Sequence, residues 1–111
     1  MTPKITLWCT FQFEAWHCWP DAPEKFSYLA NKHRHIFHGR AEWRVTNPDR
    51  ELEFIDLKHQ ALEAVDELLN KGTMSWSCEQ WAINIANAIH ATSVTISEDG
   101  ENGATVEIDN Q

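Results

Sequence analysis

Two long segments in which apolar and polar side chains alternate constrain the fold more than any other feature of this sequence. The first covers residues 4–16, and the second covers residues 33–46. Because successive side chains of a β-strand point to opposite faces, this alternation predicts strands with one face buried. We therefore expect two long antiparallel strands, each offering one apolar face to the core.

The middle of the chain predicts a short strand followed by two helices. Residues 51–55, which follow a turn, are expected to form the short strand. Asp56 is then expected to cap a helix whose apolar positions follow helical spacing up to Gly72. A second helix is expected to begin near Ser77, where polar residues precede another run with helical spacing.

The C-terminal part predicts a β-hairpin, with strands in residues 93–98 and 104–108. The element order is therefore ββ(β)ααββ, which favours the α+β class: an antiparallel four-stranded sheet with two helices on one face. The whole chain, residues 1–111, fits a single domain. Since such a sheet has two open edges, we expect the chain to cover them by forming a homo-oligomer.

Charge, hydropathy and cysteine content exclude several classes of protein. The formal net charge of −8 argues against nucleic-acid binding, because lysine and arginine supply most of the affinity for phosphates. The sequence has no apolar run that could span a membrane and no secretion leader, so we expect a cytoplasmic protein. The three cysteines, Cys9, Cys18 and Cys78, lack a Cys-x-x-Cys spacing and are expected to be reduced thiols.

Basic residues gather in one part of this acidic chain. Four of the nine, namely Lys32, Arg34, Arg40 and Arg44, lie in or just before the second alternating segment. Such an island can receive a small anion, for example a phosphorylated metabolite, or it can be an ordinary polar strand face. The pattern alone does not separate these two interpretations.

Three histidines form the strongest chemical signal in the sequence. His33 and His35 lie two residues apart in a predicted strand and project from the same face, and His17 ends the preceding strand. Three imidazoles that leave one position open are typical of a catalytic zinc site, whereas structural zinc sites usually have four ligands rich in cysteine. The alternative is a solvated or hydrogen-bonded strand face. No metal role is expected for the remaining histidines, which are His38, His59 and His90.

Several short motifs occur in the order found in one known family. Phe13-Glu14-Ala15-Trp16-His17 fits a Phe-x-Ala-x-His segment, and His33-Arg34-His35 fits a His-Gly-His segment except at its centre. Ser77-Cys78-Glu79 fits a Thr-x-Glu motif at a helix start, and Glu98 follows at the end of a predicted strand. Together these motifs resemble the 6-pyruvoyl-tetrahydropterin synthase and 6-carboxy-tetrahydropterin synthase family.

This resemblance implies the tunnelling fold (T-fold), with zinc bound by the same three histidines. It also implies that Glu98 anchors a pterin or purine-like ring, beside Ser77 and Glu79 at the helix start. A carboxylate suits this role because it can accept two hydrogen bonds from the N–H groups of such a ring. The resemblance further implies a trimer or hexamer, and it leaves open whether the protein belongs to biopterin, folate or queuosine metabolism or to a pathway outside these three.

The catalytic part of the family pattern is largely missing from this chain. Leu29 stands at the position of the family's catalytic cysteine, and it cannot transfer a proton. Asn70 and Lys71 stand in the stretch where the family has an Asp-His pair. The neighbouring Tyr28 can carry a proton in principle, and the catalytic residues stay unassigned.

Three functions remain open on these residues. The first is a divergent zinc-dependent synthase, a carbon–oxygen lyase acting on a pterin such as dihydroneopterin triphosphate. The second is a catalytically inactive relative that binds a pterin or a purine nucleotide without turnover. The third is an oligomeric interaction protein whose interface uses some of the six tryptophans.

Overall fold

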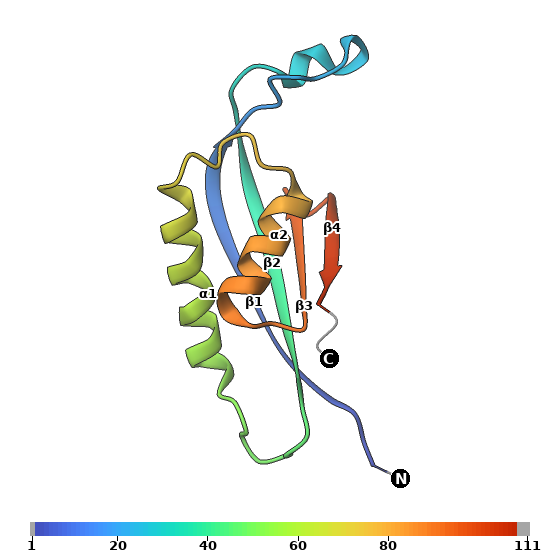
Figure 1. The fold of residues 1–111 in the computed structure, drawn as a ribbon, viewed down its shortest axis with the longest axis vertical. Coiled ribbons are helices and arrows are strands. Elements are labelled where there is room, and N and C mark those ends of the chain that lie inside the picture. The colour runs from blue at the N-terminus through green and yellow to red at the C-terminus, as the bar shows by residue number, and fades with distance from the viewer. Residues whose placement is uncertain (1, 109–111) are drawn as a thin grey trace.

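The computed structural model describes residues 2–108 and contains a four-stranded sheet with two helices on one of its faces (Figure 1). The strands lie in the order β1, β2, β3, β4, and each pairs antiparallel with its neighbour. Their bounds are Ile5–His17, His33–Val45, Ser93–Glu98 and Asn102–Glu107. The helices are η1 (Glu24–Leu29), α1 (Phe54–Leu69) and α2 (Cys78–Ile89). The predicted α+β class and antiparallel sheet are confirmed.

β1 and β2 form a long two-stranded ribbon. They pair over 13 residues, from Ile5 opposite Val45 to His17 opposite His33. β3 pairs only with residues 37–42 of β2, so the ribbon extends beyond β3 at both ends. The connection between β1 and β2, which contains η1, projects away from the rest of the structure (Figure 1). His17 and His33 therefore lie at the base of this projection.

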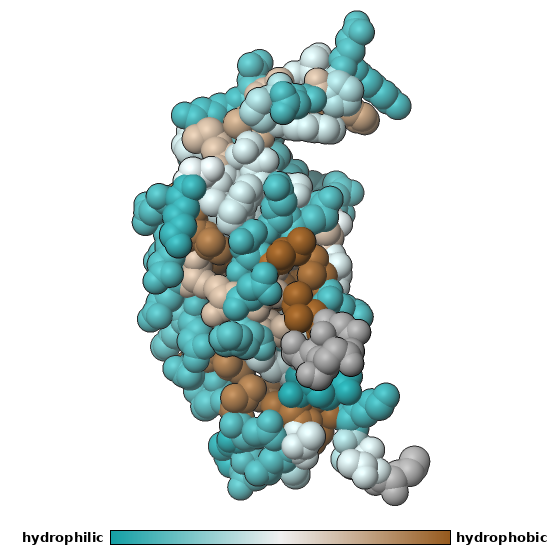
Figure 2. All heavy atoms as spheres, viewed as in Figure 1, coloured by the Kyte–Doolittle hydropathy of each residue, from teal (hydrophilic) through white to brown (hydrophobic). Residues whose placement is uncertain are grey.

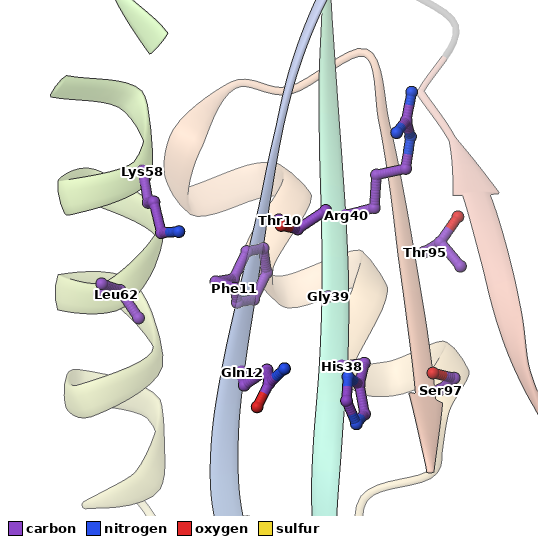
Figure 3. Close-up of a pocket in the computed structure, with 10 residues that line it drawn as sticks. All are labelled: Thr10, Phe11, Gln12, His38, Gly39, Arg40, Lys58, Leu62, Thr95 and Ser97. Carbon is purple, nitrogen blue, oxygen red and sulfur yellow. The ribbon is translucent and has the colours of Figure 1, made fainter. Parts of the chain in front are cut away.

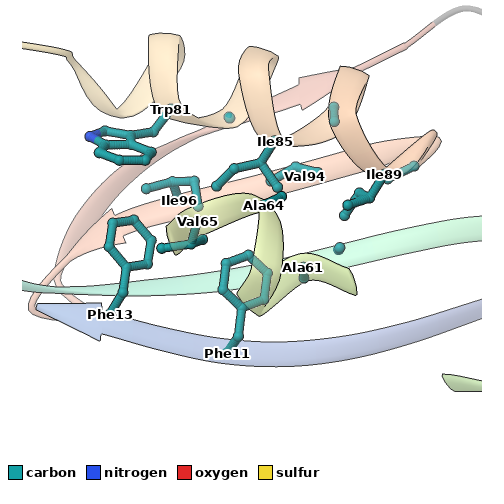
Figure 4. Packing of buried hydrophobic residues seen from close by; sticks show 14 of the residues in the cluster. Phe11, Phe13, Ala61, Ala64, Val65, Trp81, Ile85, Ile89, Val94 and Ile96 are labelled. Carbon is teal, nitrogen blue, oxygen red and sulfur yellow. The ribbon is translucent and has the colours of Figure 1, made fainter. Parts of the chain in front are cut away.

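The core lies between the sheet and the two helices. Phe11 and Phe13 point from β1 toward Trp81 and Ile85 of α2, and all four side chains are buried (Figure 4). The rings of Phe13 and Trp81 have their centroids 4.9 Å apart. Burying a large apolar side chain contributes about 1.5–3 kcal/mol relative to leaving it exposed. The alternating sequence of β1 is thus satisfied by one layer of helices.

The structure differs from the sequence-based prediction just before α1. Residues 51–55 form no strand, and Asp56 lies in the first turn of α1 instead of capping it. The cap is Glu53, whose carboxylate accepts hydrogen bonds from the backbone N–H groups of Ile55 (2.9 Å) and Asp56 (3.0 Å). Both edges of β2 are already occupied by β1 and β3, so a strand here would have no partner on β2. A carboxylate at position 53 instead satisfies two N–H groups of the helix.

Four of the six tryptophans lie either in the core or on the uncovered face of the sheet. Trp43 and Trp81 are buried, whereas Trp8 and Trp16 are 51% and 54% exposed. On the helical face, hydrophilic side chains dominate over α1, and apolar atoms show mainly where α2 meets β4 (Figure 2). Across residues 2–108, no helix is long and apolar enough to cross a membrane.

Candidate metal centre

The paired ends of β1 and β2 bring three histidines together. His17 lies directly opposite His33 in the strand register, and His35 follows two residues later on the same face of β2. Each of the three offers one ring nitrogen, and these atoms all lie within 4.8 Å of one another. Nδ1 of His17 and Nε2 of His33 are 3.2 Å apart. The geometry therefore allows three imidazoles to converge on one ion.

Two of the three histidine rings, those of His33 and His35, are oriented by hydrogen bonds at their Nδ1 atoms. Nδ1 of His33 lies 2.7 Å from the carbonyl oxygen of Asn31, and Nδ1 of His35 lies 2.8 Å from Oδ2 of Asp99. Because a carbonyl oxygen and a carboxylate only accept hydrogen bonds, each Nδ1 must carry the proton. In the neutral form of each ring, Nε2 is then the unprotonated nitrogen, and binding to a metal requires such a nitrogen.

The surroundings of Nε2 of His35 show whether these residues fit a metal ion. This atom is buried and makes no hydrogen bond, although Oε2 of Glu98 lies 3.4 Å away. Buried polar atoms nearly always have a hydrogen-bond partner, so an orphaned one calls for an explanation. A metal ligated by His17, His33 and His35 supplies the missing partner, and a set of three nitrogens suits zinc. The donor set therefore fits the expected ion.

The electrostatics of the site favour neutral imidazole. Burial lowers the pKa of His17, while the charge of Glu98 acts in the opposite direction and His33 adds to the decrease. A histidine must be neutral to bind a metal, so the lowered pKa keeps His17 ready as a ligand at neutral pH. Burial also raises the pKa of the nearby Cys78 thiol to about 11, with Glu98 and Glu79 adding to the increase.

A cavity of about 530 Å³ lies beside the histidines. Its wall includes His17 and His33, Leu29 from the projecting connection, residues 77–80 at the start of α2, and Glu98 at the end of β3. Ser77 caps α2, and the Oγ atom of Ser77 accepts a hydrogen bond from the backbone N–H of Gln80 at 3.1 Å. The structure therefore gathers around one cavity the three residues predicted to contact a ligand, Ser77, Glu79 and Glu98.

A larger hollow of about 640 Å³ lies around Gly39 on β1 and β2, and its lining includes Lys58 and Leu62 of α1 (Figure 3). It contains none of the three clustered histidines. Arg40, which lines it, is engaged by Glu42 at 3.1 Å and lies 4.1 Å from the ring centroid of Trp8. Volume alone therefore does not identify the chemical site. For Arg40, the paired Glu42 carboxylate favours an ordinary polar strand face over an anion site.

Sequence reasoning missed Asp99 and Asn31 as partners of the histidines. Asp99 is 64 residues from His35 and lies between the two strands of the predicted hairpin, and Asn31 contributes its main-chain oxygen. Neither contact leaves a local signal in the sequence. Tyr28 is 70% exposed and does not line this cavity.

Comparisons with known proteins support the fold. No protein-family model and no curated protein matches the sequence. Among solved structures, 6-pyruvoyl tetrahydropterin synthase from Caenorhabditis elegans aligns with a TM-score of 0.72 and 17% sequence identity, covering 97% of this chain and 98% of that one. A likeness at this identity establishes the fold alone. The expected tunnelling fold is thus confirmed: the chain is folded like a 6-pyruvoyl tetrahydropterin synthase.

Proposed function

We propose that this chain is a divergent, zinc-dependent protein of the tetrahydropterin synthase type that acts on or binds a pterin in the cytoplasm. The observation that carries the proposal is the convergence of three imidazole nitrogens within 4.8 Å beside a cavity that also contains Glu98. The structural similarity to 6-pyruvoyl tetrahydropterin synthase supports the choice of a pterin-like ligand. Dihydroneopterin triphosphate is the substrate that such a protein would be tested with first.

In this proposal, different residues of the site bind the metal and orient the ligand. His17, His33 and His35 would hold zinc, which supplies a Lewis acid that polarises a hydroxyl or carbonyl oxygen of the ligand. Glu98 would accept two hydrogen bonds from the N–H groups of the ring and so fix its orientation. Residues 77–80 at the start of α2 would form a further part of the cavity wall.

A second candidate function is ligand binding without turnover, and the cavity wall favours it. Leu29 lines the cavity and carries no titratable group. The thiol of Cys78 also lines it, but a pKa of about 11 keeps this thiol protonated at neutral pH. General acids and bases typically supply about 10²-fold to 10⁴-fold each, so their loss predicts turnover that is absent or very slow.

The zinc proposal is tested by metal analysis of protein purified without chelator. About one zinc per chain is expected in the native protein, and the His35→Ala variant should lose it because one of the three ligands is gone. His38→Ala is the matched control, since His38 lies on the same strand but on its opposite face. Substoichiometric zinc in the native protein, or full retention in His35→Ala, would contradict the proposal.

The ligand proposal is tested by titrating a panel of pterins into the native protein and a Glu98→Gln variant in a calorimeter. Loss of a charge-assisted contact should weaken binding by about 1.5–3 kcal/mol, which is roughly tenfold or more. A turnover assay with dihydroneopterin triphosphate, run beside the titration, separates the two candidates. Ordinary turnover would refute the inactive candidate, and equal affinity in both proteins would remove Glu98 from the site.

A further inference from the structure

Asp99 continues the hydrogen bonding of β3 with its side chain after the strand has ended. The last paired residues are Glu98 on β3 and Phe37 on β2. Asp99 then adopts a left-handed backbone conformation with φ 56°, which aspartate tolerates better than most residues. Its backbone N–H donates to the carbonyl oxygen of Ile36 at 2.7 Å, and its Oδ1 accepts from the backbone N–H of Ile36 at 3.1 Å.

The second oxygen of the same carboxylate faces the histidine cluster. Oδ2 of Asp99 lies 2.8 Å from Nδ1 of His35. With Oδ1 fixed on the main chain of β2, the carboxylate cannot rotate away without breaking the hydrogen bond to Ile36. The His35 ring is therefore held at a defined angle by a group that is itself anchored at two points.

We propose that Asp99 is the positioning residue of the histidine site, holding His35 in the tautomer that turns an unprotonated Nε2 toward His17 and His33. The inference deepens the proposed zinc function and rests on it. A carboxylate that accepts the Nδ1 proton fixes both the tautomer and the orientation of a metal-binding histidine. The buried Nε2 of His35, which has no hydrogen-bond partner, is the atom that this arrangement presents.

His35 differs in this respect from the other two histidines. His33 is held by the main-chain oxygen of Asn31, and the backbone of Trp76 acts to raise the pKa of His17. These two contacts follow from the path of the chain and cannot be removed by changing a side chain. Asp99 is thus the point where a single substitution should alter the orientation and protonation of a ligand while leaving all three histidines in place.

The substitution Asp99→Asn is a specific test, because an amide has only one oxygen and cannot accept hydrogen bonds from both Ile36 and His35 as the carboxylate does. Its single oxygen can accept from the N–H of Ile36 or from Nδ1 of His35, and its NH₂ group then faces the other. If the oxygen keeps the main-chain contact, Nδ1 of His35 must become an acceptor and the proton moves to Nε2. Asparagine also tolerates the left-handed backbone, so the turn itself should be preserved.

Two measurements test the inference. Competition with a colorimetric chelator should show zinc binding that is roughly 10-fold to 100-fold weaker in Asp99→Asn than in the native protein. Glu101→Gln is the matched control, because it removes an equal charge from an exposed residue of the same turn, and its affinity should be unchanged. Independently of metal, long-range ¹⁵N–¹H NMR of the zinc-free protein should show the proton of His35 on Nδ1 in the native chain and on Nε2 in Asp99→Asn.

The outcomes separate this inference from the proposed function. Native protein that binds zinc while Asp99→Asn binds it equally well would overturn the role of Asp99 and leave the zinc site standing. Native protein that binds no zinc would overturn both. The NMR measurement on the native protein does not depend on whether a variant folds. If it places the proton of neutral His35 on Nε2, the inference is refuted by that result alone.

Discussion

Replacing Gly39 with alanine should destabilise the fold, because the Phe11 ring lies where a side chain would be. Gly39 on β2 is directly opposite Phe11 on β1. A Cβ atom at Gly39 would lie 2.3 Å from Cζ and 2.4 Å from Cε2 of that ring. Carbon atoms in favourable contact are about 3.5–4.0 Å apart, so the ring would have to move by roughly 1 Å or more.

The expected cost follows from how tightly the ring is held. Phe11 is 3% exposed and packs inside the core (Figure 4), so it has little room to move. Overpacking of a core costs about 1–3 kcal/mol, and so close a contact points to the upper end. Removing a glycine from a strand interior offsets about 0.5–1 kcal/mol. We expect the free energy of unfolding to fall by about 2 kcal/mol.

Equilibrium urea unfolding, followed by tryptophan fluorescence, measures this loss. The matched control repeats Gly39→Ala in a Phe11→Leu background, because leucine lacks the Cζ, Cε1 and Cε2 atoms that make the close contacts. There the alanine should cost at least about 1 kcal/mol less, since residues in direct contact couple by about 0.5–3 kcal/mol. An equal cost in both backgrounds, or no loss in the native one, would refute the ring contact as the reason for a glycine here.

Two further predictions concern acid stability and assembly. Glu51 accepts backbone hydrogen bonds from Asn47 (2.8 Å) and Thr46 (3.0 Å), which lower its pKa. A lowered folded-state pKa means that this contribution to stability is complete above the ordinary glutamate pKa of about 4.3 and is lost as the pH falls through the folded-state value. Glu51→Gln should therefore reduce the free energy of unfolding at pH 7 by more than at pH 3, and urea unfolding that gave equal losses at both values would contradict this. Because β1 is an edge strand of 13 residues, we also predict a closed trimer or hexamer of the 12.9 kDa chain in solution. Light scattering that shows a monomer at micromolar concentration would rule this assembly out.

The sequence determined the long strands and the faces that they bury. Alternation in residues 4–16 predicts which side of β1 is apolar, and the structure buries Phe11 and Phe13 while leaving Trp8 exposed. This works because the period of a strand is fixed by its backbone. The start of α2 was equally readable, since Ser77 and Gln80 form a capping box through local hydrogen bonds. Local chemistry decided both features.

The start of α1 could not be predicted from the local sequence alone. Asp56 and Glu53 can both accept hydrogen bonds from the N–H groups of a first helical turn, and residues 51–55 also have the composition of a strand. In the structure Glu53 is the residue that accepts from the first turn, and residues 51–55 have no partner on β2, because β1 and β3 occupy both of its edges. That competition between elements is absent from the segment itself.

The histidine site likewise has one part that the sequence predicts and one part that depends on tertiary structure. The spacing of His33 and His35 put two imidazoles on one face, because residues two apart in a strand always share a face. The contact of Asp99 with His35, by contrast, joins residues 64 positions apart. It exists only because β3 pairs with β2 in one register and then turns back at a left-handed residue. The sequence thus determined the common face of His33 and His35, while tertiary pairing alone decided that the Asp99 carboxylate contacts His35.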